Sequence, residues 1–181
     1  MPVIHPSRTT PPILPDLLRP GLQLVFCGTA PSRASAAAAA YYAHPGNAFW
    51  RALFGAGITP RQLAPAEYPQ LLALGIGLTD LAKQHSGVDA ELPKHAFDVA
   101  ALREKIERYQ PRLLAFTSKN AARAVLGSRI DYGLQTQGLG STRFFVLPSP
   151  SGQARRSWNL TPWRALAAEL HSTGSIPRPP G

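Results

Sequence analysis

Apolar residues along this chain form short uninterrupted runs, which alternate with segments whose apolar positions recur every three or four residues. Uninterrupted runs are typical of strands buried on both faces of a sheet, and the wider spacing is typical of amphipathic helices. Strands are predicted at 22–27, 75–81, 112–117 and 143–147. Helices are predicted at 47–56, 66–74 and 119–126. Two more are predicted: one begins after a cap at Asp98, and the other runs from Thr161-Pro162 to Leu170. The alternation predicts an α/β fold with three α/β/α layers around a mostly parallel sheet of four to five strands.

The two ends of the chain differ in composition from its middle. Residues 1–20 contain six prolines and are predicted to form an extended N-terminal arm on or off the surface. Residues 21–171 are predicted to form one α/β domain, and residues 172–181 a flexible tail. The small-residue stretch 34–40 fits either a helical turn or a slim loop.

Chain length and net charge limit the classes of protein to which this chain can belong. With 181 residues, 44% of them apolar, the chain can bury a substantial core. The net charge is +9, and between Arg103 and Arg164 eleven basic residues face three acidic ones. This concentration suits a face that binds phosphates, although a generally basic protein would show it as well.

Cysteine content and hydropathy bear on the compartment. The single cysteine, Cys27, excludes a disulfide framework and is interpreted as a buried small side chain. No apolar run is long enough to span a membrane, and no signal-peptide pattern begins the chain. A cytoplasmic monomer without a metal or another cofactor is therefore expected.

Three segments follow predicted strands and should converge at one edge of the sheet: 28–32, 79–87 and 148–156. The third combines a Pro-rich turn with hydroxyl groups, a glycine and two arginines. Such a loop can grip phosphates through side chains and closely approaching backbone amides, although an ordinary surface loop has a similar composition.

Specific motifs occupy two of these segments and a stretch between them. They are Gly-Thr-Ala-Pro-Ser at 28–32, Tyr-Ala-His-Pro-Gly-Asn-Ala-Phe-Trp at 42–50 and Ser-Pro-Ser-Gly at 149–152. In this order and spacing, the chain resembles the uracil-DNA glycosylase superfamily from about residue 22 to residue 170. The likeness is nearest to the branch specific for G:U and G:T mismatches, and the second motif carries most of it.

The resemblance implies roles for individual residues. Tyr42 matches the aromatic residue that stacks on an extruded base, whereas His44 and Asn47 are interpreted as fixing the loop and capping the helix. Gln153 matches a wedge residue and Arg155 an arginine that reaches the opposite base. The implied base-binding residues are Gly28, Thr29, Ala30, Pro31, Ser32, Tyr42 and Ser149. The implied DNA-binding residues are Lys119, Ser151, Gly152, Gln153, Arg155 and Arg156.

The chain departs from the family pattern at Ala30. The mismatch-specific branch has an asparagine here that positions the attacking water, and alanine cannot hydrogen-bond water through its side chain. We expect Asp80, at the end of a predicted strand, to supply the missing oxygen as a general base, although it could equally cap a turn. His85 could bind the base or leaving group, or could be a loop histidine. His85 and the nearby acids lack metal-ligand spacing, and one cysteine excludes an iron–sulfur cluster.

Three functions remain open from the sequence. The first is a monofunctional uracil-DNA glycosylase of base excision repair, which flips deoxyuridine out of DNA and leaves an abasic site. The second is a module that binds uracil or abasic DNA with little turnover. The third is a glycosylase for hypoxanthine, because small residues near Ala30 and Ser32 would admit a purine.

Overall fold

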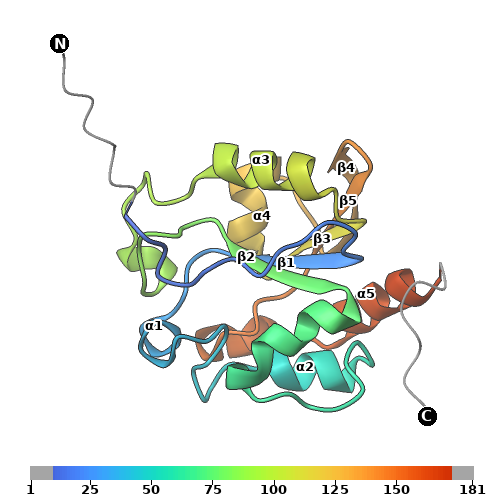
Figure 1. Ribbon diagram of the computed structural model, residues 1–181, viewed down its shortest axis with the longest axis horizontal. Helices are drawn as coiled ribbons and strands as arrows, with labels where there is room; N and C mark the ends of the chain where they lie inside the picture. Colours follow the sequence, from blue (N-terminus) through green and yellow to red (C-terminus); the bar gives the residue numbers. More distant parts are fainter. Residues whose placement is uncertain (1–9, 173–181) are drawn as a thin grey trace.

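The computed structural model describes residues 10–172, which contain a five-stranded sheet of order β2-β1-β3-β5-β4 (Figure 1). The strands are β1 (Leu24–Gly28), β2 (Ile76–Asp80), β3 (Leu113–Phe116), β4 (Gly133–Leu139) and β5 (Thr142–Val146). β2, β1, β3 and β5 run parallel, and β4 joins β5 in the antiparallel sense. Every residue of β1, β2 and β3 is buried, which explains their largely apolar sequences.

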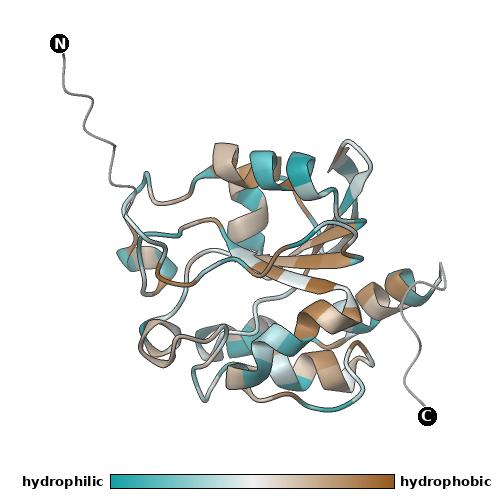
Figure 2. Cartoon of the chain, in the orientation of Figure 1, coloured by the Kyte–Doolittle hydropathy of each residue, from teal (hydrophilic) through white to brown (hydrophobic). Residues whose placement is uncertain are grey.

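Helices cover both faces of the sheet, as Figure 1 shows. They are α1 (Arg33–Ala38), α2 (Phe49–Gly55), α3 (Val99–Tyr109), α4 (Lys119–Leu126) and α5 (Thr161–His171), with 3-10 helices η1 (Pro65–Leu74), η2 (Asp89–Glu91) and η3 (Gly152–Ser157). α3 and α4 pack on one apolar cluster, and α2, η1 and α5 pack on another. The apolar colours of Figure 2 gather on the strands between these layers. The predicted three-layer α/β/α fold is thus confirmed.

Several elements differ from their predicted form. The helix predicted at 66–74 is the 3-10 helix η1, and Pro69 inside it lacks the N–H that an α-helix would use. β4 was not predicted, because it is an exposed edge strand rich in glycine and glutamine rather than an apolar run. Between 34 and 40 the helical alternative is correct: α1 begins after Ser32, whose Oγ accepts from the Ser35 N–H at 3.0 Å.

The described part of the Pro-rich N-terminal segment lies along β2. Leu17 and Leu78 form an antiparallel bridge with two backbone hydrogen bonds of 2.9 Å, and the Ile13 N–H donates to the Lys83 carbonyl. Leu14 is 1% exposed and belongs to the core. Residues 10–20 therefore cover the edge of β2. Residues 1–9 and 173–181 lie outside the described chain, and the division into arm, domain and tail stays a prediction.

Two composition-based expectations can be compared with the structure. Cys27 is fully buried in β1, where desolvation raises the pKa of its thiol above the usual range, so it is a packing residue. Among residues 10–172, no helix is both long and apolar enough to cross a bilayer.

Candidate active site

A pocket of about 520 Å³ opens where the parallel strands end. Its walls come from the segments that follow β1, β2, β3 and β5, with residues 87–90 closing one side. The lining includes Gly28, Thr29, Ala30, Pro31, Ser32, Tyr42, Asp80, Lys119, Ser149, Ser151 and Gln153. The predicted convergence at one sheet edge therefore holds for most of the proposed site residues, because parallel strands present their carboxyl ends on the same side.

Asp80 is the last residue of β2 and pairs in register with Gly28 at the end of β1. Its side chain is 4% exposed and lines the pocket, and Oδ2 has no hydrogen-bond partner among the described residues. Burial raises the pKa of this carboxyl to about 7, and the charge of Lys83 only partly opposes the rise. A carboxyl with such a pKa can take up and release a proton near neutral pH.

Gly28 allows the pocket floor to form. A Cβ at this position would lie 2.7 Å from Asp80 Oδ1 and 3.2 Å from Tyr42 Oη, and the Thr117 hydroxyl is also adjacent. Only glycine lets the backbone pass this close to a carboxylate and a phenol. The end of β1 is thus in direct contact with the group that can act as a base.

Tyr42 is held rigidly at the side of the pocket. Its ring stacks on Phe49 with centroids 3.9 Å apart and an interplanar angle of 18°, and its hydroxyl lies 3.1 Å from Thr117 Oγ1. Tyr42 adopts a left-handed backbone conformation with φ of 52°. Phe49 occupies one ring face, so a planar ligand in the pocket could stack only on the other.

Asp89 fastens the loop after β1 to the start of α4. The Thr29 hydroxyl donates to Asp89 Oδ1 at 2.6 Å, and the Asn120 amide donates to Asp89 Oδ2 at 2.9 Å. Both oxygens of one carboxylate therefore hold two pocket walls together. The sequence had shown Asp89 only as an acid near His85, because residues 29 and 120 come together only in the folded chain.

His85 is not among the residues that line the pocket with Asp80. Its ring packs edge-on against His95, with centroids 5.8 Å apart, and it does not contribute to the pocket lining. The geometry favours the alternative interpretation of His85 as a loop histidine. Four residues, 81–84, separate it from Asp80 along the chain.

The 149–156 loop borders the pocket and is held by local contacts. Ser149 Oγ accepts from the Ser151 N–H, and the Pro150 carbonyl accepts from the Ala48 N–H at the start of α2. Ser149, Ser151 and Gln153 line the pocket, whereas Gly152 and Arg155 line a second cavity on the other side of the loop. Arg156 is exposed and lines neither.

His44 and Asn47 take the structural roles interpreted for them. His44 Nδ1 accepts from the Gly46 N–H at 2.9 Å, and Asn47 Oδ1 accepts from the Phe49 N–H at 2.9 Å. Asn47 also lines the pocket. The helix begins two residues later than predicted, at Phe49, and Asn47 still satisfies its first amide.

Lys119 and Tyr132 form part of the pocket rim. Lys119 begins α4, and its Nζ lies 4.5 Å from the centroid of the Tyr132 ring. Both residues line the pocket, and Tyr132 is 38% exposed. The sequence had not marked Tyr132, because a single tyrosine between polar residues carries no local signal.

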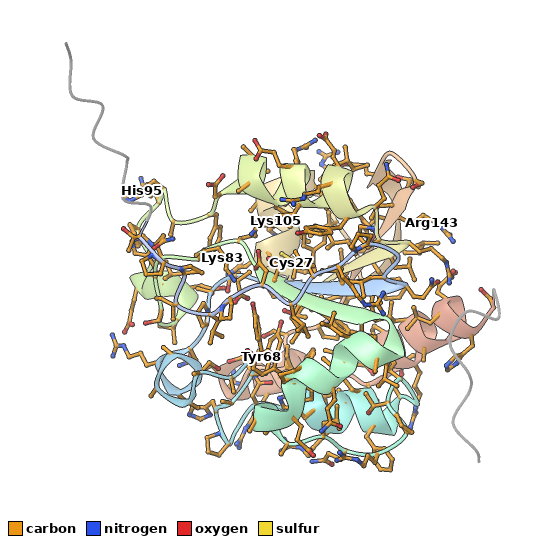
Figure 3. All side chains as sticks on the ribbon, viewed as in Figure 1. Cys27, Tyr68, Lys83, His95, Lys105 and Arg143 are labelled. Carbon is orange, nitrogen blue, oxygen red and sulfur yellow. The ribbon has the colours of Figure 1, made fainter. Side chains whose placement is uncertain are left out.

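A partly buried ion-pair cluster lies beside the end of β2. Asp16 forms 2.8 Å ion pairs with Lys83 and Lys105 and accepts from the Thr79 hydroxyl at 2.7 Å. Lys105 reaches this cluster from α3 (Figure 3). Burial by itself would raise the pKa of Asp16, but the two lysines and the hydroxyl lower it below the usual value. Sequence reasoning missed this cluster, because its members come from three distant segments.

Two comparisons relate the chain to known proteins. The model of the uracil DNA glycosylase superfamily matches residues 15–170. The solution NMR structure of a "putative uracil DNA glycosylase" from Methanosarcina acetivorans superposes with a TM-score of 0.60 at 25% sequence identity. That similarity covers 87% of this chain and 96% of the other.

Proposed function

We propose that this chain, which belongs to the uracil DNA glycosylase superfamily, hydrolyses the N-glycosidic bond of a flipped deoxyuridine in DNA and leaves an abasic site. The environment of Asp80 is the observation that carries the proposal. Asp80 is a buried carboxyl at a strand end, inside a pocket large enough for a nucleoside, and its pKa is near neutrality. Within residues 10–172, one of its oxygens has no hydrogen-bond partner.

The pocket suggests how the base would be held. Backbone amides in the 28–32 loop would bind the base carbonyls, which requires no particular side chain at Ala30. The face of Tyr42 opposite Phe49 would stack on the base, a contact that contributes roughly 1–3 kcal/mol. Ser149 would add a hydroxyl from the opposite wall.

Ionised Asp80 would act on water. The carboxylate would accept a proton as the water oxygen bonds to C1′, while the bond from C1′ to nitrogen breaks and the base leaves with its electrons. The negative charge would also stabilise the cationic sugar of a dissociative transition state. The departing base would then be protonated from solvent. Asp80 thus would replace the oxygen that Ala30 lacks.

We also propose that the enzyme is monofunctional. Lys119 is the lysine that lines the pocket within the described residues, and its ammonium lies over the Tyr132 ring at the rim. Lys83 is tied to Asp16. Neither is placed as a free amine beside Asp80, which argues against a Schiff-base lyase step.

Single-turnover release of uracil from a duplex oligonucleotide tests the proposal. We expect Asp80→Asn to reduce the rate about 10²–10⁴-fold, the range for loss of a positioned general base. Glu104→Gln, which changes an exposed carboxyl on α3, is the matched control and should leave the rate unchanged. Unchanged release in Asp80→Asn would exclude Asp80 as the catalytic group.

Ala30 favours one alternative, a module that binds uracil or abasic DNA with little turnover. A gel-shift assay run beside the single-turnover measurement separates the two. Tight binding of the duplex without base release by the unmodified protein would establish the binding module instead of the glycosylase.

The volume of the pocket and the small side chains at Ala30 and Ser32 favour the other alternative, a hypoxanthine-DNA glycosylase. The same duplex with hypoxanthine in place of uracil decides between them. Faster release of hypoxanthine than of uracil would make the purine the substrate.

A further inference from the structure

Residues 87–90 form a strap along one side of the candidate active-site pocket, and all four line it. The Gly87 N–H donates to the Pro31 carbonyl at 3.0 Å, so the strap runs beside the 28–32 loop. The backbone amides of this loop are the groups assigned above to the carbonyls of the base. Contacts that fix the conformation of the loop therefore bear on base recognition.

The backbone of the 28–32 loop is held at its two ends by ordinary secondary structure. Its first two carbonyls accept from the N–H groups of Leu81 and Ala82 at 2.9 and 2.7 Å, which joins the start of the loop to the chain after β2. Its last carbonyl, that of Ser32, accepts from the Ala36 N–H at 2.9 Å as α1 begins. The centre of the loop lies between these attachments, where the strap contacts it.

Asp89 supplies the side-chain link between the strap and the loop. Its Oδ1 accepts from the Thr29 hydroxyl at 2.6 Å, and its Oδ2 accepts from the Asn120 amide at 2.9 Å. Hydrogen bonds to an ionised carboxylate are roughly twice as strong as those between neutral groups. Asn120 lies in the first turn of α4, so one carboxylate joins the loop and the strap to a helix that packs on the sheet.

The neighbouring charged contact is much weaker. Glu91, one residue beyond the strap, pairs with Arg33 at 2.8 Å, but the two side chains are 49% and 77% exposed. An ion pair in contact with water contributes little to stability. Asp89 lines the pocket and is half-buried, so its two hydrogen bonds are better protected from water than this pair.

We propose that Asp89 is a positioning residue for base recognition. Through Thr29, it holds the 28–32 loop in the conformation in which the backbone amides reach the carbonyls of the flipped base. The physical reason is pre-organisation, because a loop that is already fixed loses less conformational entropy when the base binds. This proposal rests on the proposed function, which assigns the loop to the base.

Equilibrium binding to two labelled duplexes tests the role of Asp89. One duplex carries 2′-fluoro-2′-deoxyuridine, whose fluorine disfavours the positive charge that the sugar develops during bond cleavage, so the base is retained. The other carries a stable abasic-site analogue. We expect Asp89→Ala to reduce the ratio of the two affinities, uridine duplex over abasic duplex, about tenfold, because only the first duplex offers a base to the loop. An unchanged ratio would overturn the proposal.

Three further variants make this test specific. Asp89→Asn should restore most of the ratio, because its amide oxygen still accepts from Thr29. Glu91→Gln also removes a negative charge and should leave the ratio unchanged. Thr29→Val removes the hydroxyl donor at nearly constant shape and should reproduce the loss, and adding Asp89→Ala to it should then have little further effect. Full additivity of these two substitutions would overturn the action of Asp89 through Thr29.

Hydrogen exchange of the ligand-free protein distinguishes failure of this proposal from failure of the proposed function. The Ala82 and Gly87 N–H groups donate to carbonyls of the loop, so in Asp89→Ala both should exchange about tenfold faster, while the amides of β3 keep their rates. Unchanged exchange at these two amides, or equal acceleration in β3, would overturn the positioning role. Equal binding of the uridine duplex and an undamaged duplex by the unmodified protein would instead contradict the proposed function.

Discussion

The ionisation of Asp80 is the residue-scale property on which the proposed chemistry depends. Removing a carboxylate from water without a hydrogen-bond partner costs free energy, and the raised pKa expresses that cost. A general base must lose its proton to work, so the same burial that gives Asp80 a useful pKa also destabilises the fold when the group is ionised.

Folding stability should therefore depend on pH through Asp80. Between pH 3.8 and about 7 the unfolded chain releases this proton while the folded chain keeps it, so stability falls as pH rises through this window and levels off above it. At roughly 1.4 kcal/mol per pKa unit, the loss is a few kcal/mol. Asp80→Asn should remove this loss and unfold at higher urea concentration than the unmodified protein at pH 8.

Glu104→Gln serves as the control, because its exposed carboxyl should not alter the pH dependence of stability. An Asp80→Asn protein with the same pH dependence of stability as the unmodified protein would contradict the assignment of this pKa.

The rate of uracil release should rise between pH 5 and 8 with an apparent pKa near 7, because only the ionised carboxylate of Asp80 can accept a proton.

Gly28 provides a steric prediction at the same scale. Gly28→Ala would place a methyl group 2.7 Å from Asp80 Oδ1, so the carboxyl must move away from the strand end. We expect at least a tenfold loss in the rate of base release, since small misplacements of catalytic groups have large effects. Gly55→Ala is the control: it meets its nearest neighbour at 3.6 Å inside a helix and should keep full activity.

At the scale of elements, residues 10–20, which precede β1, contact both the apolar core and the residues at the end of β2. Leu14 and Leu17 attach this segment to the sheet, and Asp16 then reaches Lys83 and Lys105. The cluster is partly buried, so loss of one member leaves charges without a partner. Because Lys83 lowers the pKa of Asp80, the cluster also influences the candidate base.

Asp16→Ala should destabilise the protein by about 3 kcal/mol, since two lysines lose their counter-ion in a partly buried setting. Denaturant unfolding at pH 7 measures this effect. Because the folded pKa of Asp16 is lowered, its contribution is present above pH 3.8 and disappears as pH falls further. Glu91→Gln breaks the exposed pair with Arg33 and should cost under about 1 kcal/mol. Equal effects of the two substitutions would contradict a special role for the Asp16 cluster.

At the scale of the whole molecule, charge determines how the protein meets its substrate. The net charge is +9, and the positive excess lies mainly in the half of the chain that carries α4 and the 149–156 loop. Lys119 borders the pocket that holds Asp80, and Arg51 and Arg155 border the second cavity. This distribution supports association with a polyanion before any base is recognised.

Binding to undamaged duplex should therefore weaken steeply with salt. With several phosphate contacts, we expect affinity to fall at least 100-fold between 50 and 200 mM salt, measured by fluorescence anisotropy. The charge-neutral substitution Gln137→Asn on the exposed β4 edge should not change the slope. A salt-independent affinity would contradict an interface built on phosphate contacts.

The sequence by itself determined the layers of this molecule. Uninterrupted apolar runs specified strands buried on both faces, and the residues after them were bound to meet at one edge, because parallel strands end together. Its three motifs also identified the family, and it predicted Asp80 at the end of a strand. That Asp80 replaces the side chain missing at Ala30 stays a proposal. These patterns are local, because they depend only on residues that are close together in the sequence.

The tertiary structure alone decided the environment of each group. It excluded His85 from the pocket and placed Asp89 across two of its walls. It also paired Asp16 with Lys83 and, in the described part of the chain, left an oxygen of Asp80 without a hydrogen-bond partner. Burial and charge pairing depend on which distant segments enclose a side chain, and free energies of solvation follow from that enclosure rather than from neighbours in sequence.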